Sequence, residues 1–282
     1  MSEALPDIAA ELRRQDHDRF LTVLFAPAGR RDALIALYAF NLEVARARER
    51  VSQPLIGLMR LQWWRDSIAG IYQGSPRHHA VVEPLAAAIR AHRLERGLFD
   101  RLIDAREADM DEQPPASLEA LEAYASATSG ALGRLAAGIL AEGGVTAAAG
   151  AAADAAGTAF ALAGLLRAVP FHARERRLYL PQSVIDATGL EVGALFELHG
   201  SPALREACRT VAERAEARLA EGRAAARGLP RRLLPALLPA VLARQHLRRL
   251  ARAGYDPFTR LVQEPPPGRA WRLLAASLAG RI

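Results

Sequence analysis

The chain contains no lysine, and every one of its 37 basic residues is an arginine. A phosphate-binding P-loop needs a lysine at a fixed position, and Schiff-base catalysis needs a lysine amine. Both kinds of site are therefore excluded.

Cysteine is almost absent as well, because Cys208 is the one cysteine among 282 residues. No intrachain disulfide can form within the chain. A lone thiol with no evident base beside it is typical of a small buried apolar residue. We therefore expect Cys208 to be structural and the protein to reside in a reducing compartment.

Long hydrophobic runs are missing too. The apolar stretches are rich in alanine, as in 147–166, or are interrupted by Pro235 and Pro239. None of them is typical of a spanning helix of about 20 apolar residues. The first residues, MSEALPDIAAELRRQD, lack the apolar segment of a signal peptide. We expect a cytoplasmic protein, in a bacterium, that contacts the inner membrane only peripherally.

The formal net charge is +6, and arginines alternate with glutamates along much of the chain. Nucleic-acid binding calls for a concentrated basic stripe or a known motif. The sequence contains no such motif, so we expect no nucleic-acid partner.

Helix signals follow one another along the chain. Alanine and leucine are abundant and β-branched residues are sparse, which favours helices. No alternating strand pattern occurs. We predict one all-α domain over residues 1–282, with a loop that leads from Pro170 to a turn at Tyr179-Leu180-Pro181. The helices are expected at 3–19, 30–50, 54–73, 81–92, 97–111, 118–141, 146–169, 203–227, 230–252 and 269–280, with a short one starting at 256.

Two segments carry a recognisable pattern. The first is Tyr38-Ala39-Phe40 on an apolar helix, and the second is ALAGLLRAVPFHARERRLYLP over 161–181. Together with Trp64-Arg65 and LIDAREADMD, they resemble the squalene/phytoene synthases, which condense two isoprenoid diphosphates head to head. The resemblance is clearest over 20–181. It implies an isoprenoid-synthase-type helical bundle around a central cleft, with the helices of 202–282 in the same bundle.

The acidic residues of that family are largely replaced here. Its first signature is an aspartate-rich motif, at whose ends this chain has Ala45 and Glu49. Its second signature places polar or acidic residues at three successive turns of one helix, where this chain has Gly164, Ala168 and His172. Magnesium requires oxygen ligands, so the resemblance implies a degenerate site with no catalytic residues, no metal and no cofactor.

Other family positions are retained. The resemblance implies that Tyr38, Phe40 and Tyr179 lie along the cleft and that Arg167 and Arg177 lie beside the diphosphate. A guanidinium group suits a lipid phosphate or a partner's carboxylate equally well. Pairing of these arginines with acids such as Glu175 is the alternative.

Within the family, the stretches 51–72 and 164–181 are most similar to a degenerate branch whose members help to build respiratory complex I. The resemblance implies a non-catalytic assembly or binding factor. Its protein partner would be a complex I subunit or an assembly intermediate.

Two other functions remain open. An active prenyl transferase could use a rearranged magnesium site, for which the sequence offers Glu49, Asp104, Glu107 and Asp111. The last three share one helix face, where Arg101 and Arg106 could instead pair with them. A non-catalytic isoprenoid- or lipid-binding module would keep an apolar tunnel with Arg167 and Arg177 at its mouth.

The remaining aromatic and basic stripes have structural explanations. Adjacent helical positions differ by about 100°, so we expect one of Trp63 and Trp64 in the core and the other near the surface. Arg244, Arg248 and Arg252 repeat every four residues beside apolar positions, which fits either membrane-surface contact or core packing with a solvated edge.

Overall fold

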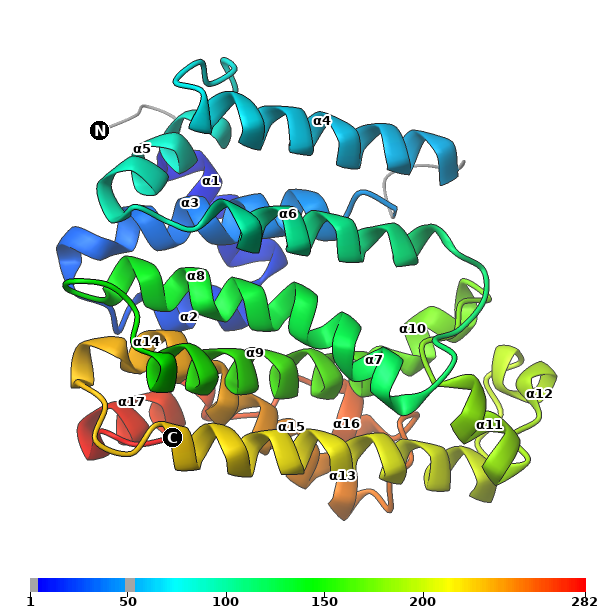
Figure 1. Cartoon of the computed structure of the whole chain (residues 1–282). Coiled ribbons are helices and arrows are strands. Elements are labelled where there is room, and N and C mark those ends of the chain that lie inside the picture. Colours follow the sequence, from blue (N-terminus) through cyan, green and yellow to red (C-terminus); the bar gives the residue numbers. More distant parts are fainter. Residues whose placement is uncertain (1–4, 49–53) are drawn as a thin grey trace.

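The computed structural model describes residues 5–48 and 54–282, and within these ranges it contains helices and no strand. The prediction of an all-α fold is therefore confirmed. Figure 1 shows the helices stacked as layers, with α4 along one edge and α13 along the opposite edge. The N-terminal part contains α1 Leu5–Gln15, α2 His17–Val23, α3 Ala28–Ala45, α4 Pro54–Tyr72, α5 Val82–His92, α6 Arg96–Ala105 and the 3₁₀ helix η1 Arg106–Met110.

The second part of the chain completes the bundle. Buried hydrophobic residues from both parts form one continuous core, running from Ile8 to Ile282. The elements are α7 Leu118–Ala125, the π turn η2 Ser126–Gly130, α8 Ala131–Leu140, α9 Ala147–Arg167, α10 Val169–Arg174, α11 Gln182–Thr188, α12 Val192–Phe196, α13 Pro202–Ala225, the 3₁₀ turn η3 Arg231–Leu233, α14 Leu234–Leu237, α15 Pro239–Arg252, α16 Arg260–Gln263 and α17 Arg269–Ala279.

Helix α9 is the central element of the second part. It packs against α8, α13 and α15, and its many alanines allow these neighbours to approach closely. By length and composition α9 could cross a membrane, but 67% of its most apolar window is buried inside the protein. Its apolar character is therefore accounted for by its place in the core.

One glycine sets the distance between α9 and η2. A Cβ atom at Gly157 would lie 2.1 Å from the backbone oxygen of Ser129, a distance that real structures do not contain. Only a residue without a side chain fits there, so the contact depends on this glycine.

Helix α3 is the corresponding buried element of the first part. Phe40 is fully buried and meets Trp64 and Phe99 edge-on, with ring centroids 5.2 and 5.4 Å apart. Trp64 is buried, whereas its neighbour Trp63 is only partly buried and lies under the guanidinium of Arg77. The expected division of the two tryptophans between core and surface is confirmed.

Several predicted helix limits were wrong. The helix expected over 3–19 is broken at Asp16, whose carboxylate accepts a hydrogen bond from the Arg19 amide and starts α2. Pro170 does not end the helical path, because it occupies the first turn of α10, where a missing N–H is tolerated. The helix expected over 230–252 is divided into η3, α14 and α15, the last of which starts at Pro239.

The loop expected after Pro170 is partly helical, because α10 extends to Arg174, and further helices occur within 182–200, where the sequence predicted no element. Short helices α11 and α12 occupy 182–188 and 192–196. The short helix expected from 256 begins later, as α16, because Asp256 accepts a hydrogen bond from the Phe258 amide and forms a turn there. Helices of five to seven residues bury few side chains, so their periodicity is too short to be recognised.

Replacing Gly157 with alanine is expected to destabilise the protein by about 2 kcal/mol, since the methyl group must push α9 away from η2. Gly164→Ala is the matched control in the same helix. A Cβ atom there meets nothing within 4 Å, so this change should be neutral or stabilising by up to about 1 kcal/mol. Urea unfolding measures both, and equal stability of the two variants would contradict the proposed close contact.

Candidate functional site

A buried carboxylate, that of Asp109, joins three segments of the chain. Asp109 lies in η1 and is 4% exposed. Its Oδ1 accepts hydrogen bonds from the hydroxyl groups of Tyr124 at 2.7 Å and Tyr179 at 2.8 Å. Its Oδ2 accepts a hydrogen bond from Arg106 at 3.2 Å. These contacts connect η1 with α7 and with the Tyr-Leu-Pro segment before α11.

Arg177 completes this polar cluster. Its Nη2 donates to the backbone oxygen of Asp109 at 2.5 Å and to the Tyr179 hydroxyl at 2.9 Å. Arg106 also donates to the Tyr124 hydroxyl at 2.8 Å. The partner found for Arg177 is thus the Asp109 segment, whereas Glu175 is exposed. In this position Arg177 holds the Tyr-Leu-Pro segment against η1.

Burial determines the protonation of the cluster. It raises the pKa values of the Tyr124 and Tyr179 hydroxyls, so both stay protonated and can donate to Asp109. Burial, aided by the charge of Arg177, lowers the pKa of His172 to about 4. The His172 ring lies 4.6 Å from that of Tyr179 and is neutral at neutral pH. The Asp109 carboxylate is therefore occupied by the protein's own donors.

The positions of the second motif follow one helical path. The amide of Ala168 donates to the Gly164 oxygen and that of His172 to the Ala168 oxygen, both at 2.9 Å, across the junction of α9 and α10. Ala45 is partly buried at the end of α3, and Glu49 lies outside the described residues. The motif positions that are described provide a hydrogen, two methyl groups and an imidazole. These groups do not fit a magnesium ion, which requires several oxygen ligands.

A polar cavity of about 430 Å³ lies beside Gly164 and Arg167. Its wall includes the junction of α1 and α2, where Asp16 forms an ion pair with Arg19 at 2.6 Å. Farther along the wall, Asp18 is bound by other elements of the chain. The carboxylates of this cavity are therefore engaged by neighbouring cations.

Asp18 is the more deeply buried of the two carboxylates, with 6% of its surface exposed. Arg269 donates to it at 2.5 Å, and the His246 Nε2 atom is 3.5 Å away. Burial opposes ionisation, but His246, Arg269 and Arg167 more than compensate and lower the pKa of Asp18 to about 2. Arg167 lines the same cavity, and its positive charge contributes to the low pKa of Asp18.

Two of the other predicted binding residues are buried, and a third, Tyr179, is partly buried. Tyr38 is 3% exposed, and Phe40 is part of the aromatic core described above. Arg177 and Tyr179 border a hollow of only about 10 Å³, which is room for one water molecule. The apolar tunnel expected for a lipid-binding module is therefore closed beside Arg177 by packed side chains, among them Leu165, Val169 and Leu178.

Two of the alternative metal ligands, Asp104 and Glu107, are paired with the same arginine. Arg65 binds Asp104 at 2.8 Å and also pairs with Glu107. The prediction that Arg101 and Arg106 would pair with these acids was wrong, because Arg101 donates to Ser126 and Arg106 to Asp109. Asp111 is exposed. Among the residues that the structure describes, no group of three or more histidine, cysteine, aspartate or glutamate side chains is arranged to hold a metal ion.

Sequence reasoning missed Asp109, although a signal was present. Asp109 stands seven residues after Leu102, and therefore on the buried face of that segment. An acid on an apolar face indicates a buried carboxylate with partners. The arginines that surround Asp18 come from distant parts of the chain, and no local spacing indicates them.

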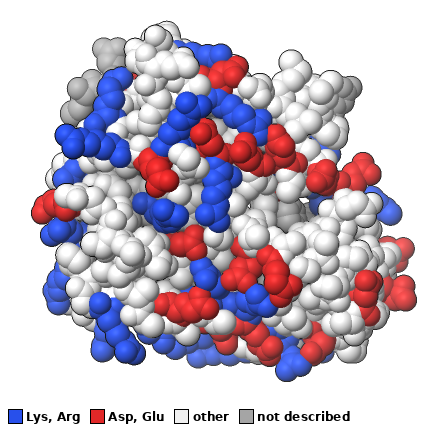
Figure 2. Space-filling view, viewed as in Figure 1, with Lys and Arg blue, Asp and Glu red and all other residues white. Residues whose placement is uncertain are grey.

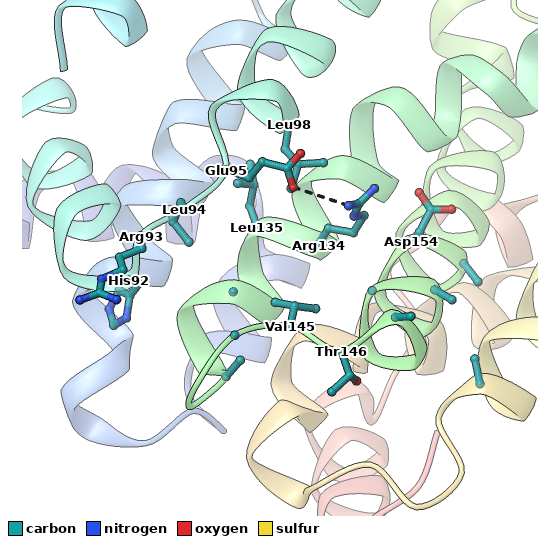
Figure 3. A pocket seen from close by; sticks show the side chains of 18 of the residues that line it. His92, Arg93, Leu94, Glu95, Leu98, Arg134, Leu135, Val145, Thr146 and Asp154 are labelled. Atoms are coloured by element: carbon teal, nitrogen blue, oxygen red, sulfur yellow. Dashed lines mark ion pairs between the residues drawn. The ribbon is translucent and has the colours of Figure 1, made fainter. Parts of the chain in front are cut away.

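A larger groove of about 1310 Å³ lies away from this cluster. Figure 3 shows its wall, with Glu95 reaching toward Arg134 and Asp154 pointing inward from α9. The Glu95–Arg134 pair spans 3.7 Å, and Asp154 is bound by Arg218 at 2.6 Å. Acidic and basic side chains also alternate over the face shown in Figure 2. Two of the acids that line the groove are thus paired with its own arginines.

Comparisons with known proteins agree with this geometry. A sequence profile described as "Squalene/phytoene synthase" matches residues 12–272. The chain is 32% identical over 247 residues to the cow protein "NADH dehydrogenase (ubiquinone) complex I, assembly factor 6", a match that covers 88% of this chain and 74% of that one. It is 29% identical over 212 residues to presqualene diphosphate synthase of Rhodopseudomonas palustris, covering 74% of each. The fold is similar to that of a squalene synthase from Alicyclobacillus acidocaldarius, with a TM-score of 0.79, 21% identity and coverage of 90% and 95%.

Asp109→Asn is expected to destabilise the protein by about 3 kcal/mol, since it leaves Arg106 buried without a compensating charge. Asp111→Asn, two residues away and exposed, serves as the control and should change stability by less than about 0.5 kcal/mol. Thermal and urea unfolding measure both. An Asp109 variant as stable as the control would contradict a structural role for the carboxylate.

Proposed function

Because the chain belongs to the squalene/phytoene synthase family, we propose that it is a non-catalytic member that assists the assembly of respiratory complex I. The observation that carries this proposal is that residues without oxygen ligands occupy the family's motif positions on two separate helices. These residues are Ala45 at the end of α3, Gly164 in α9, and Ala168 directly after α9. Loss at one helix could be offset by a neighbour, whereas loss at both removes the oxygen ligands that magnesium needs.

The contacts inside the cleft support the same function. Asp18 is bound to Arg269, and Asp16 is bound to Arg19. Both arginines line the cavity and are thereby paired with the protein's own carboxylates. A diphosphate would have to displace these pairs without a metal ion to neutralise its charge.

The similarity to complex I assembly factors gives the proposal its direction. The chain covers 74–75% of the mammalian proteins of that name at 30–32% identity. We therefore propose a complex I subunit or an assembly intermediate as partner, in the cytoplasm beside the inner membrane. In this function the fold serves as a rigid binding scaffold.

The active prenyl transferase remains the second candidate, because two presqualene diphosphate synthases match at 28–29% identity. Its metal would have to be held by acids at new positions. Asp104 and Glu107 are available for this only if Arg65 releases them.

Deletion of the gene in the organism that encodes it is expected to reduce assembled complex I several-fold, because an assembly factor acts before the complex is complete. Native electrophoresis of membranes and NADH-dependent quinone reduction measure this. A plasmid copy should restore the complex, and succinate dehydrogenase is the control that should not change.

The opposite result would identify an enzyme. If the deletion left complex I intact but removed an isoprenoid hydrocarbon from the lipid extract, the assembly function would be wrong. A plasmid copy carrying Arg65→Gln would then show whether the acids of α6 and η1 participate.

A further inference from the structure

The last helix of the described chain turns an apolar face outward. In α17, Trp271, Leu274 and Leu278 are 75%, 37% and 70% exposed. Spaced at i, i+3 and i+7, they lie on one side of the helix, whereas Leu273 is fully buried against the bundle. A tryptophan and two leucines in solvent on one stripe indicate a surface that has a partner.

The charge around this helix is strongly asymmetric. Residues 223–282 contain twelve arginines and two acids, a net charge of +10, which leaves −4 for residues 1–222. Both acids are already paired, Asp256 with Arg205 and Glu264 with Arg260. Most of the arginines in this segment therefore lack an acidic partner in the described part of the chain.

Four of these arginines surround a small cavity at the end of α17. Arg223, Arg227, Arg231 and Arg281 line a hollow of about 370 Å³, together with apolar residues that include Leu234. No acidic residue lines it. Figure 1 places the C-terminal mark and α17 beside the end of α13, where Arg223 lies. The arrangement offers several guanidinium groups to one anion.

A fifth arginine nearby shows the same lack of compensation. The Nε and Nη2 atoms of Arg244 are buried and have no hydrogen-bond partner. Burial, together with the charges of Arg223 and Arg248, lowers the pKa of Arg244. Cations gathered without a carboxylate are stabilised when an anion approaches. In Figure 2, the lower left of the molecule, where Figure 1 places α17, shows blue and white atoms, and the red ones lie higher or farther right.

We propose that α17 lies in the surface of a bilayer rich in anionic lipids. Trp271, Leu274 and Leu278 insert among the lipid headgroups, and the four arginines that line the cavity at the end of α17 bind lipid phosphates. A helix with tryptophan and leucine on one face and arginines beside it is the kind that binds at a membrane interface. Arginine binds phosphate oxygens through its planar fork, and an anionic surface attracts a segment of +10. The same charge opposes docking of a second copy of the chain.

This inference deepens the proposed function and rests on it only for the identity of the membrane. The contact explains how an assembly factor whose most apolar helix, α9, is mostly buried in the core would stay near a membrane complex. Its test uses lipid vesicles alone, so the two proposals can fail independently. The protein can be required for complex I assembly without binding vesicles, and it can bind vesicles without being required for assembly.

The experiment is co-sedimentation of the full chain with vesicles of phosphatidylcholine, with and without about 30% phosphatidylglycerol. The wild type should bind the anionic vesicles, and Trp271→Ser/Leu274→Ser/Leu278→Ser should reduce binding about tenfold. Leu55→Ser/Met59→Ser is the matched control, because it removes equally exposed apolar side chains from α4, and it should bind like the wild type. Thermal unfolding of every variant checks that its stability equals that of the wild type, so that a difference in binding does not reflect unfolding.

Two further measurements separate the contribution of the arginines to vesicle binding from that of the apolar side chains. Arg227→Gln/Arg281→Gln should weaken binding to anionic vesicles and reduce its dependence on salt. Trp271 fluorescence should shift to shorter wavelength on anionic vesicles, and the shift should be absent in Trp271→Phe. Equal binding by the triple serine variant and the wild type would overturn the proposal. A wild type that does not bind anionic vesicles would also overturn it. The same holds if the wild type forms a dimer and the triple serine variant is monomeric.

Discussion

The buried carboxylate of Asp109 is the interaction on which the site depends. It accepts hydrogen bonds from two tyrosines and one arginine, and it thereby fixes the Tyr-Leu-Pro segment against η1 and α7. A buried charge is tolerated only when it is fully paired, so these partners are required for the fold itself. The same contacts direct Arg177 inward and keep the space beside Tyr179 to the volume of one water molecule.

The polar cavity follows the same principle. Asp18 pairs with Arg269, and the Nε2 atom of His246 lies 3.5 Å away, so a carboxylate of the chain already neutralises one of the arginines that line the wall. The helical path through Gly164, Ala168 and His172 keeps the spacing of a ligand-bearing helix without its oxygen atoms. The bundle is thus preserved, and a group of arginines without acidic partners lies elsewhere, around α17.

The sequence predicts much of the fold and less of the site. The long helices α3, α4, α9 and α13 follow from caps, prolines and composition. The short helices between Pro181 and Ser201 do not, since too few residues show a period. The substituted motif positions are visible in the sequence. Apart from Arg106, which stands three residues before Asp109, the partners of Asp18 and Asp109 are not, because residues from 15 to 251 positions apart are known to meet only once the chain is folded.

We propose that the cleft does not support magnesium-dependent chemistry, because its motif positions lack oxygen ligands. The most direct measurement is incubation of the purified protein with farnesyl diphosphate, with and without magnesium, followed by thermal unfolding and product extraction. We expect no product and no shift in Tm that depends on magnesium. Magnesium-dependent stabilisation together with formation of presqualene diphosphate or squalene would contradict it.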